Sequence, residues 1–118
     1  MVWLLADTGA TRTTLLDRDL RILGILFDAL EPSPVALVGI GGSVRSCILR
    51  GVELTFGSEE GDLVLRQDLW TVQHDLAQMP PDEAIRVLRL PSILGRDVLN
   101  RFRFTADYQA GRVVLEGP

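Results

Sequence analysis

Three glycine-bearing segments of this chain hold the residue types that could carry out chemistry. They are Asp7-Thr8-Gly9-Ala10, Gly39-Ile40-Gly41-Gly42 and Ile93-Leu94-Gly95-Arg96-Asp97. Each is weak evidence alone, because Asp-Thr-Gly also occurs at ordinary strand-ending turns, where the aspartate accepts backbone hydrogen bonds. The order and spacing of the three segments, taken together, are more informative than any one of them.

The aspartate of the first segment could take part in hydrolysis. Without a metal or a nucleophilic side chain, cleaving a peptide bond needs one group that accepts a proton from water and another that donates a proton to the departing amine. Two carboxyl groups that share one proton can do both. The chain holds one Asp-Thr-Gly and no Asp-Ser-Gly, so one copy supplies half of such a pair. Catalysis would therefore require a homodimer in which the two Asp7 side chains meet on the symmetry axis.

Short strands and two brief helices are predicted to position these segments. An apolar run over residues 2–6 predicts a buried strand that ends at Asp7. Asp17 stands where a helix N-cap would, and Gly24 where such a helix would end. A second short helix is predicted after Gly95.

The remaining pattern is dominated by strands. They are predicted over residues 35–38, 44–49, 52–56, 63–65, 69–72, 85–90, 102–107 and 112–115. The first two would form a hairpin with a glycine-rich tip, and the last two a closing hairpin. Many short strands with two brief helices predict a mainly β domain that is closed or barrel-like.

Composition narrows the classes of protein. A length of 118 residues supports one domain and argues against a two-domain enzyme. One Cys and one His argue against a disulfide framework and against zinc, and we expect no cofactor. A net charge of −4 argues against nucleic acid as a partner. No apolar run approaches the roughly 20 residues of a membrane helix, and the first residues lack the basic start of a signal peptide, so we expect a soluble, cytoplasmic protein without a membrane partner.

The middle of the chain is acidic. Residues 52–83 hold Arg66 against eight acidic residues, and we expect solvated turns and a loop there, with a docking surface for a basic partner as the alternative. His74 lies in this region and is expected to be a loop histidine, either exposed or hydrogen-bonded. Cys47 is expected to be a small apolar residue of a strand.

Together, the three segments resemble the retropepsin-like aspartic proteases, the single-domain relatives of retroviral proteases. The resemblance runs from about residue 4 to residue 115, so that residues 1–118 would form a single retropepsin-like domain. It implies a closed, acid-protease-like β-barrel with one or two short helices. It also implies a flap hairpin that closes over an extended peptide substrate, with no metal.

The resemblance also assigns roles to residues. Asp7 would be the catalytic aspartate, Thr8 would join the two catalytic loops through hydroxyl hydrogen bonds, and Gly9 would let the backbone approach the carboxylates. Ala10 and the flap residues 39–42 would contact the substrate. The segment from Ile93 to Asp97 would support the catalytic loop, with Arg96 paired to a carboxylate.

The sequence departs from the family at two places. Only six residues precede Asp7, so an N-terminal strand that helps to form the dimer sheet is missing or shortened. Either the start is truncated, or the dimer forms through its C-terminal strand alone and activity is low or absent. Thr11-Arg12 stands where retroviral members often place an acidic pair that meets the arginine, so Arg96 would need another partner, either Asp97 or Asp17.

We therefore expect an aspartic endopeptidase that acts as a homodimer on extended peptides, with an acidic to mildly acidic optimum. The alternative is a non-catalytic module of retropepsin shape that binds peptides or assembles. A third reading is a fragment of a larger polyprotein whose activity depends on upstream sequence.

Overall fold

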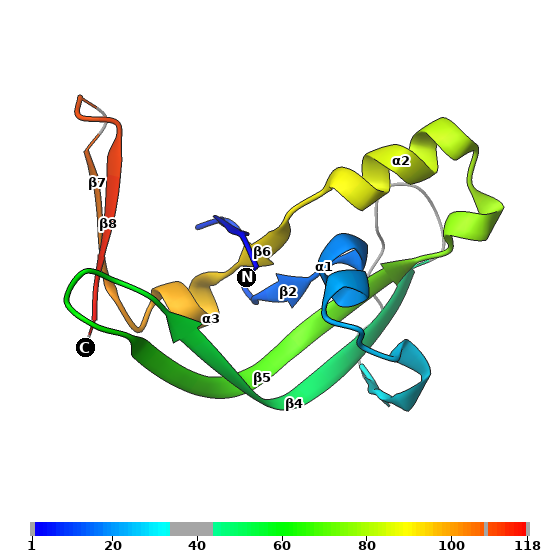
Figure 1. Ribbon diagram of the computed structural model, residues 1–118, viewed down its shortest axis with the longest axis horizontal. Helices are drawn as coiled ribbons and strands as arrows, with labels where there is room; N and C mark the ends of the chain where they lie inside the picture. The colour runs from blue at the N-terminus through cyan, green and yellow to red at the C-terminus, as the bar shows by residue number, and fades with distance from the viewer. Residues whose placement is uncertain (1, 34–43, 108, 118) are drawn as a thin grey trace.

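A long, twisted antiparallel hairpin forms the centre of the computed structural model, which describes residues 2–33, 44–107 and 109–117 (Figure 1). The strands are β1 (Leu4–Ala6), β2 (Thr14–Leu15), β3 (Glu31–Pro32), β4 (Val44–Phe56), β5 (Leu63–His74), β6 (Ser92–Leu94), β7 (Arg103–Asp107) and β8 (Arg112–Glu116). The helices are α1 (Asp17–Ile22), α2 (Pro81–Arg89) and α3 (Arg96–Leu99), with 3₁₀ turns η1 (Phe27–Ala29) and η2 (Leu76–Gln78). The protein is thus mainly β, as predicted.

The central hairpin joins strands that the sequence pattern divided. β4 continues through a bulge between Leu49 and Val52, where Gly51 adopts a φ of 63°. This left-handed conformation suits glycine, and the Gly51 N–H donates to Asp68 Oδ1 at 2.8 Å. β5 likewise runs unbroken where two strands were predicted, because it lies between β2 and β4 and is paired on both edges.

The six-stranded sheet is open rather than closed. Its order is β1-β6-β2-β5-β4-β3, so that β1 and β3 are its edges in the described part of the chain. β1 lies parallel to β6, and β2 lies parallel to β5 and antiparallel to β6. The predicted closing hairpin forms from β7 and β8, but these strands pair with each other and project from the body (Figure 1). The expected closed barrel is therefore not confirmed, because this hairpin does not join the sheet edges.

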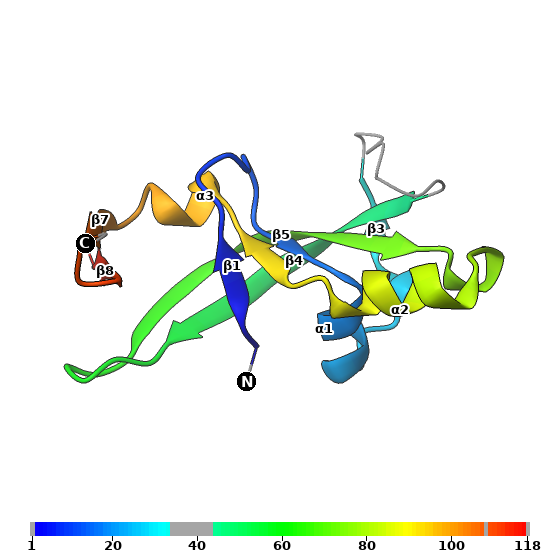
Figure 2. The same ribbon diagram turned by 90° about the horizontal axis from the view of Figure 1, so that it is seen from above.

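The segment predicted as a strand over residues 85–90 is the helix α2, and that prediction was wrong. Pro81 begins the helix, with Asp82 and Glu83 in its first turn and Arg86 and Arg89 in its last, which matches the helix dipole at both ends. The apolar run was misread as a strand. Its buried residue, Val87, lies three residues after the half-buried Ala84, which is the spacing of one face of a helix. Figure 2 shows α2 beside α1 at one end of the hairpin.

Two groups of apolar side chains form the core. The first comprises Leu15, Leu20, Phe27, Cys47 and Leu69, and it lies between α1 and the central hairpin. The second comprises Leu65, Leu94, Val98 and Leu99, and it lies under α3. Cys47 lies in β4, a strand residue as expected; its side chain is buried, and burial raises the pKa of its thiol. None of the helices in the described ranges is long and apolar enough to cross a membrane.

Helix α1 begins with two buried carboxylates. Asp17 is the first helical residue rather than the N-cap, a position that Leu16 takes. Its side chain instead binds His74, accepting from the His74 N–H at 2.8 Å and lying 2.6 Å from Nδ1. His74 is only 8% exposed, so the expectation of a loop histidine was wrong, although the hydrogen bond was anticipated.

The second carboxylate, Asp19, is tied to β6. The Ser92 hydroxyl donates to Asp19 Oδ2 at 2.5 Å and accepts from the Leu16 N–H at 2.9 Å. Arg18 forms an ion pair with Asp19 at 3.2 Å. Burial alone would raise the pKa of Asp19, but the hydrogen bonds from Ser92 and Arg18 together outweigh it and lower the pKa.

Acid should therefore weaken this contact. A lowered native pKa means that Asp19 contributes stability above its unfolded pKa of about 3.9, which is lost as the pH falls through the native value. Ser92→Ala should cost about 1–3 kcal/mol at pH 7 and should flatten the loss of stability toward pH 3. Urea unfolding at pH 7, 5 and 3 measures both, with the exposed-turn variant Ser58→Ala as control. An unchanged pH dependence in Ser92→Ala would contradict this assignment.

Candidate functional site

The loop after β1 presents the Asp7 carboxylate. The Asp7 N–H donates to the Leu94 carbonyl at 3.0 Å, and the Ala10 N–H donates to the Asp7 carbonyl at 3.1 Å, so the backbone on each side of the side chain is held. The Gly9 N–H donates to Asp7 Oδ1 at 2.9 Å. Among the described residues, this is the one hydrogen bond that the carboxylate accepts, and it makes no ion pair. Asp7 is half-buried, so its side chain remains accessible.

Gly9 lies close to the carboxylate that it binds. A Cβ atom at this position would approach Asp7 Oδ1 to 3.2 Å, which is a tight contact. Thr8 is exposed, and in the described part of the chain its hydroxyl makes no hydrogen bond. Ala10 is half-buried. The loop thus leaves one carboxylate oxygen of Asp7 and the Thr8 hydroxyl available to groups outside this chain.

β6 and the start of α3 hold this loop in place through backbone hydrogen bonds. Leu5 pairs with Ile93 and Ala6 with Leu94 in parallel register. After Leu94 the chain passes under the loop, where the Arg96 N–H donates to the Ala10 carbonyl at 2.9 Å. The structure therefore brings the first and third predicted segments together, although they lie more than 80 residues apart.

Gly95 lies at the closest approach of these two segments. A Cβ atom there would lie 2.4 Å from the Arg12 carbonyl carbon and 2.7 Å from its oxygen. The backbone of Gly95 is extended, with φ −92° and ψ −178°, so any residue could adopt its conformation. Space, rather than backbone conformation, therefore requires glycine at this position.

Asp97 joins the loop, α3 and β5. Its Oδ1 accepts from the Thr13 N–H at 2.9 Å, the Thr13 hydroxyl at 2.7 Å and the Val98 N–H at 2.9 Å. Its Oδ2 accepts from Gln67 Nε2 at 3.2 Å. Thr13 is fully buried, and its hydroxyl also accepts from the Gly95 N–H at 3.0 Å.

Thr13 and Gln67 were not identified from the sequence. Thr13 lies three residues beyond the first segment, and this nearness was the one available signal, because a threonine before a strand has no distinctive pattern. Gln67 lies in the middle of β5 and belongs to the site only through the fold. Both are needed to satisfy the buried side of Asp97.

Arg96 does not pair with either carboxylate that the sequence suggested. Asp97 is bound by Thr13 and Gln67, and Asp17 is bound by His74. Arg96 is exposed, and its Nη2 donates to the Thr11 hydroxyl at 3.0 Å. The expected ion pair was therefore wrong, because a threonine in the loop takes the place of an acid.

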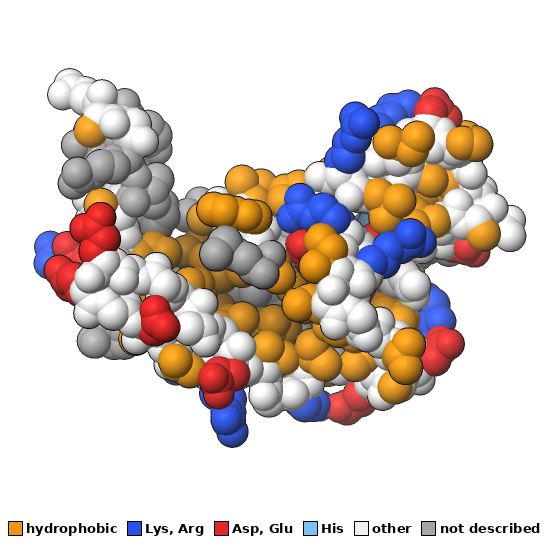
Figure 3. All heavy atoms as spheres, in the orientation of Figure 1, with side chains coloured by type: hydrophobic (Ala, Val, Ile, Leu, Met, Phe, Trp, Pro, Cys, Tyr) orange, Lys and Arg blue, Asp and Glu red, His pale blue; other side chains and the backbone are white. Residues whose placement is uncertain are grey.

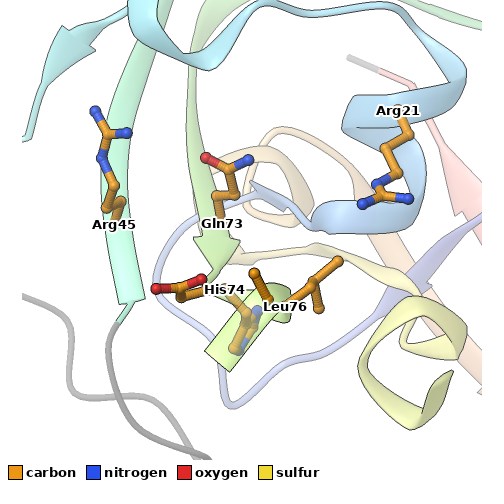
Figure 4. Close-up of a pocket in the computed structure, with 7 residues that line it drawn as sticks. Arg21, Arg45, Gln73, His74 and Leu76 are labelled. Atoms are coloured by element: carbon orange, nitrogen blue, oxygen red, sulfur yellow. The ribbon is translucent and has the colours of Figure 1, made fainter. Parts of the chain in front are cut away.

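The second predicted segment, residues 39–42, lies outside the described residues, as does the strand predicted over 35–38. A cavity of about 480 Å³ lies at the end of β5 (Figure 4). It is lined by Arg21, Arg45, Gln73, His74, Asp75, Leu76 and Ala77. None of the predicted site residues that the structure describes lines it, and Arg45 is occupied by an ion pair with Asp28.

Apolar side chains gather across the middle of one face, between the projecting hairpin and α2 (Figure 3). Trp3, which precedes β1, is 76% exposed, and Leu5 on β1 is 54% exposed. Within the described ranges, no group of three or more His, Cys, Asp or Glu side chains could hold a metal ion. The chemistry available near β1 is thus that of a carboxylate beside an apolar surface.

The fold is similar to that of a solved structure, the crystal structure of the retroviral protease-like domain of Ddi1 from Leishmania major. The TM-score is 0.56 at 12% sequence identity, and the match covers 97% of this chain and 78% of that chain. No family model matches the chain, and a search of curated proteins finds no match. At this identity the likeness shows the fold alone, which is retropepsin-like.

Proposed function

We propose that this chain is an aspartic endopeptidase that acts as a homodimer, with water activated between the Asp7 side chains of two subunits. The observation that carries the proposal is the state of Asp7, a half-buried carboxylate on a tied loop, with Gly9 as its hydrogen-bond donor among the described residues. Such a carboxylate can be reached by a water molecule and by a second carboxylate. The retropepsin-like fold supports the same reading.

In the proposed reaction, one carboxyl group of the pair is ionised and the other is protonated. The ionised Asp7 accepts a proton from water, and the water oxygen attacks the carbonyl carbon of an extended peptide. The protonated partner donates its proton to the carbonyl oxygen, which gives a neutral diol. As the diol collapses, the carboxyl group that took the proton of water donates it to the amine nitrogen, a diol hydroxyl gives its proton to the other carboxylate, and the C–N bond breaks, so that the pair again holds one proton. The Gly9 N–H would hold Asp7 Oδ1 in place through these steps.

Two features support assembly with a second copy. Among the described residues, β1 is an edge strand with exposed apolar side chains, so it presents a backbone edge that no other described strand pairs with and an apolar surface. The β7–β8 hairpin projects from the body, and its two strands pair with each other and with no other strand of the described ranges (Figure 1). Pairing through β1 would let a two-fold axis pass near Asp7, which follows this strand.

A homodimeric active site predicts that turnover depends on protein concentration. Below the dissociation constant of the dimer, dilution by tenfold should lower the turnover per chain by about tenfold, since the active fraction falls with chain concentration. Peptide cleavage measured over a dilution series, beside sedimentation velocity of the same samples, provides the test.

Turnover per chain that stays constant across a range in which the protein is monomeric would overturn the proposal. A monomer that binds extended peptides at all concentrations and cleaves none would instead establish the non-catalytic module.

A further inference from the structure

A second cavity, of about 560 Å³, opens beside the loop that carries Asp7. We call it the Arg12 pocket, and it is lined by Thr11, Arg12, Gln67, Asp68, Trp70, Arg96, Asp97 and Asn100. Its walls come from the end of the loop, from β5 and from α3. The proposed hydrolysis uses none of its guanidinium groups.

The two guanidinium groups of the lining have no counter-charge among the described residues. The Arg12 guanidinium lies 4.2 Å from the centroid of the Trp70 ring, and Arg96 is held by the Thr11 hydroxyl. Within the described residues neither arginine makes an ion pair. Since Trp70 is only 8% exposed, it offers a fixed surface that orients Arg12. A pre-oriented guanidinium loses little side-chain entropy when it binds an anion.

The carboxylates of the pocket are already occupied. Asp97 accepts hydrogen bonds from the loop and from Gln67. Asp68 accepts from the Gly51 N–H and pairs with Arg50 at 2.8 Å, and these two contacts lower its pKa. Arg101 reaches the rim through Gln67 Oε1 at 3.3 Å. The lining of the pocket therefore holds two guanidinium groups that form no ion pair with a described residue and two carboxylates that already accept hydrogen bonds, and this arrangement favours an anion.

The pocket lies within reach of a peptide bound over Asp7. Arg12 follows Asp7 by five residues, which span at most about 18 Å when extended. The loop between them is turned, since the Ala10 N–H bonds back to the Asp7 carbonyl, so the true separation is shorter. An extended peptide advances by about 3.3 Å per residue. A side chain within about five residues of the cleaved bond could therefore enter the pocket.

We propose that the Arg12 pocket binds the carboxylate of an acidic side chain in the peptide substrate, within about five residues of the cleaved bond. This inference rests on the proposed function and names the substrate class of that site. A planar guanidinium can donate two parallel hydrogen bonds to a carboxylate, which an amide of the same size cannot match. The substrate class is thus an extended peptide with an apolar face and one nearby Glu or Asp.

The test compares matched peptides within each protein variant. The peptides share one apolar sequence with amidated ends. Each carries a single Glu or a single Gln at one of the five positions on either side of the cleaved bond. A further Gln peptide has a free C-terminal carboxylate. The first readout is the ratio of kcat/KM for the Glu and Gln peptides. The second is the ratio of their affinities for Asp7→Asn, measured by fluorescence anisotropy, which needs no cleavage.

We expect wild type to favour Glu over Gln by about 10-fold to 100-fold at one position. Arg12→Gln should bring this ratio close to one, and Arg12→Glu should invert it. Because each ratio is taken within one variant, losses of folding or dimer cancel. The control Arg66→Gln removes an exposed arginine of β5 that does not line the pocket and pairs with Glu53, and it should keep the ratio of wild type.

Equal treatment of Glu and Gln at every position would overturn this inference, as would a preference that survives in Arg12→Gln. A preference confined to the free C-terminal carboxylate would also overturn it, since the occupant would then be a chain end. If no peptide is cleaved but Asp7→Asn binds Glu peptides more tightly through Arg12, the proposed hydrolysis fails and the pocket stands. If peptides are cleaved with no preference for Glu, the proposed hydrolysis stands and the proposed role of the pocket fails.

Discussion

Replacing Asp7 with Asn is expected to lower peptide turnover by about 10⁴-fold or more, because it removes both the base and the acid of the proposed pair, and each contributes about 10²-fold to 10⁴-fold. The fold should be retained, since the Asn carbonyl oxygen can still accept the Gly9 N–H that Asp7 Oδ1 accepts. Cleavage of a labelled peptide measures turnover, and sedimentation velocity measures assembly. Full turnover in Asp7→Asn would exclude the proposed mechanism.

Mixing the two proteins sharpens this test. If each active site needs two Asp7 side chains, equal amounts of wild type and Asp7→Asn should lower the turnover per wild-type chain to about half after exchange, because mixed dimers are inactive. Asp82→Asn is the matched control. The Asp82 side chain is exposed on α2 and forms a surface ion pair with Arg86. Mixing this variant with wild type should therefore leave the turnover per total chain unchanged.

Gly95→Ala is expected to destabilise the protein by about 3 kcal/mol or more, at the upper end of the cost of overpacking. The added methyl group would lie 2.4 Å from the Arg12 carbonyl carbon, and backbone atoms cannot move aside as a flexible side chain can. Separating the two segments would also stretch the hydrogen bond from Arg96 to Ala10. Urea unfolding monitored by circular dichroism gives the change in the free energy of unfolding.

A graded series of glycines provides the controls for this prediction. At Gly57 a Cβ atom would lie 3.7 Å from Asp62 Oδ1, an ordinary contact, so Gly57→Ala should change stability by about 0.5 kcal/mol or less. Gly9→Ala should fall between the two, because its Cβ would lie 3.2 Å from a side-chain oxygen that can shift. A Gly95→Ala variant as stable as Gly57→Ala would contradict the close approach.

The local sequence pattern predicted secondary structure correctly where neighbouring residues decide it. The strand that delivers Asp7, the helix from Asp17 and the hairpin of β7 and β8 formed where periodicity and turn residues predicted them. The prediction that the first of these strands is buried was wrong, because β1 lies at the sheet edge and Leu5 is 54% exposed. The local pattern failed over residues 85–90, since a short apolar run fits a strand or a helix and the deciding residues, Pro81 and its acidic neighbours, lie before the run. The bulge at Gly51 was missed because it interrupts alternation without ending the strand.

The candidate site also contains features that the sequence predicts and contacts that only the fold creates. The three segments could be picked out from the sequence, and because one chain carries one such motif they led to the hypothesis of a second Asp7 from another copy. The partners of the charged groups could not be foreseen: Asp97 binds Thr13 across 84 positions, and Asp17 binds His74 across 57. Arg12 faces Trp70 for the same reason, since that contact exists only once β2 has paired with β5.

By itself, the amino-acid sequence determined that this is a mainly β chain with one carboxylate motif and with glycine where two segments cross. Only the tertiary structure decided that the sheet of the described residues stays open, that Arg12 and Arg96 line one pocket, and which polar groups fill the buried side of the site. The physical reason is the sequence separation over which each interaction acts. Propensity and periodicity act over a few residues, whereas strand register and the burial of charge are settled by contacts between segments that only folding brings together.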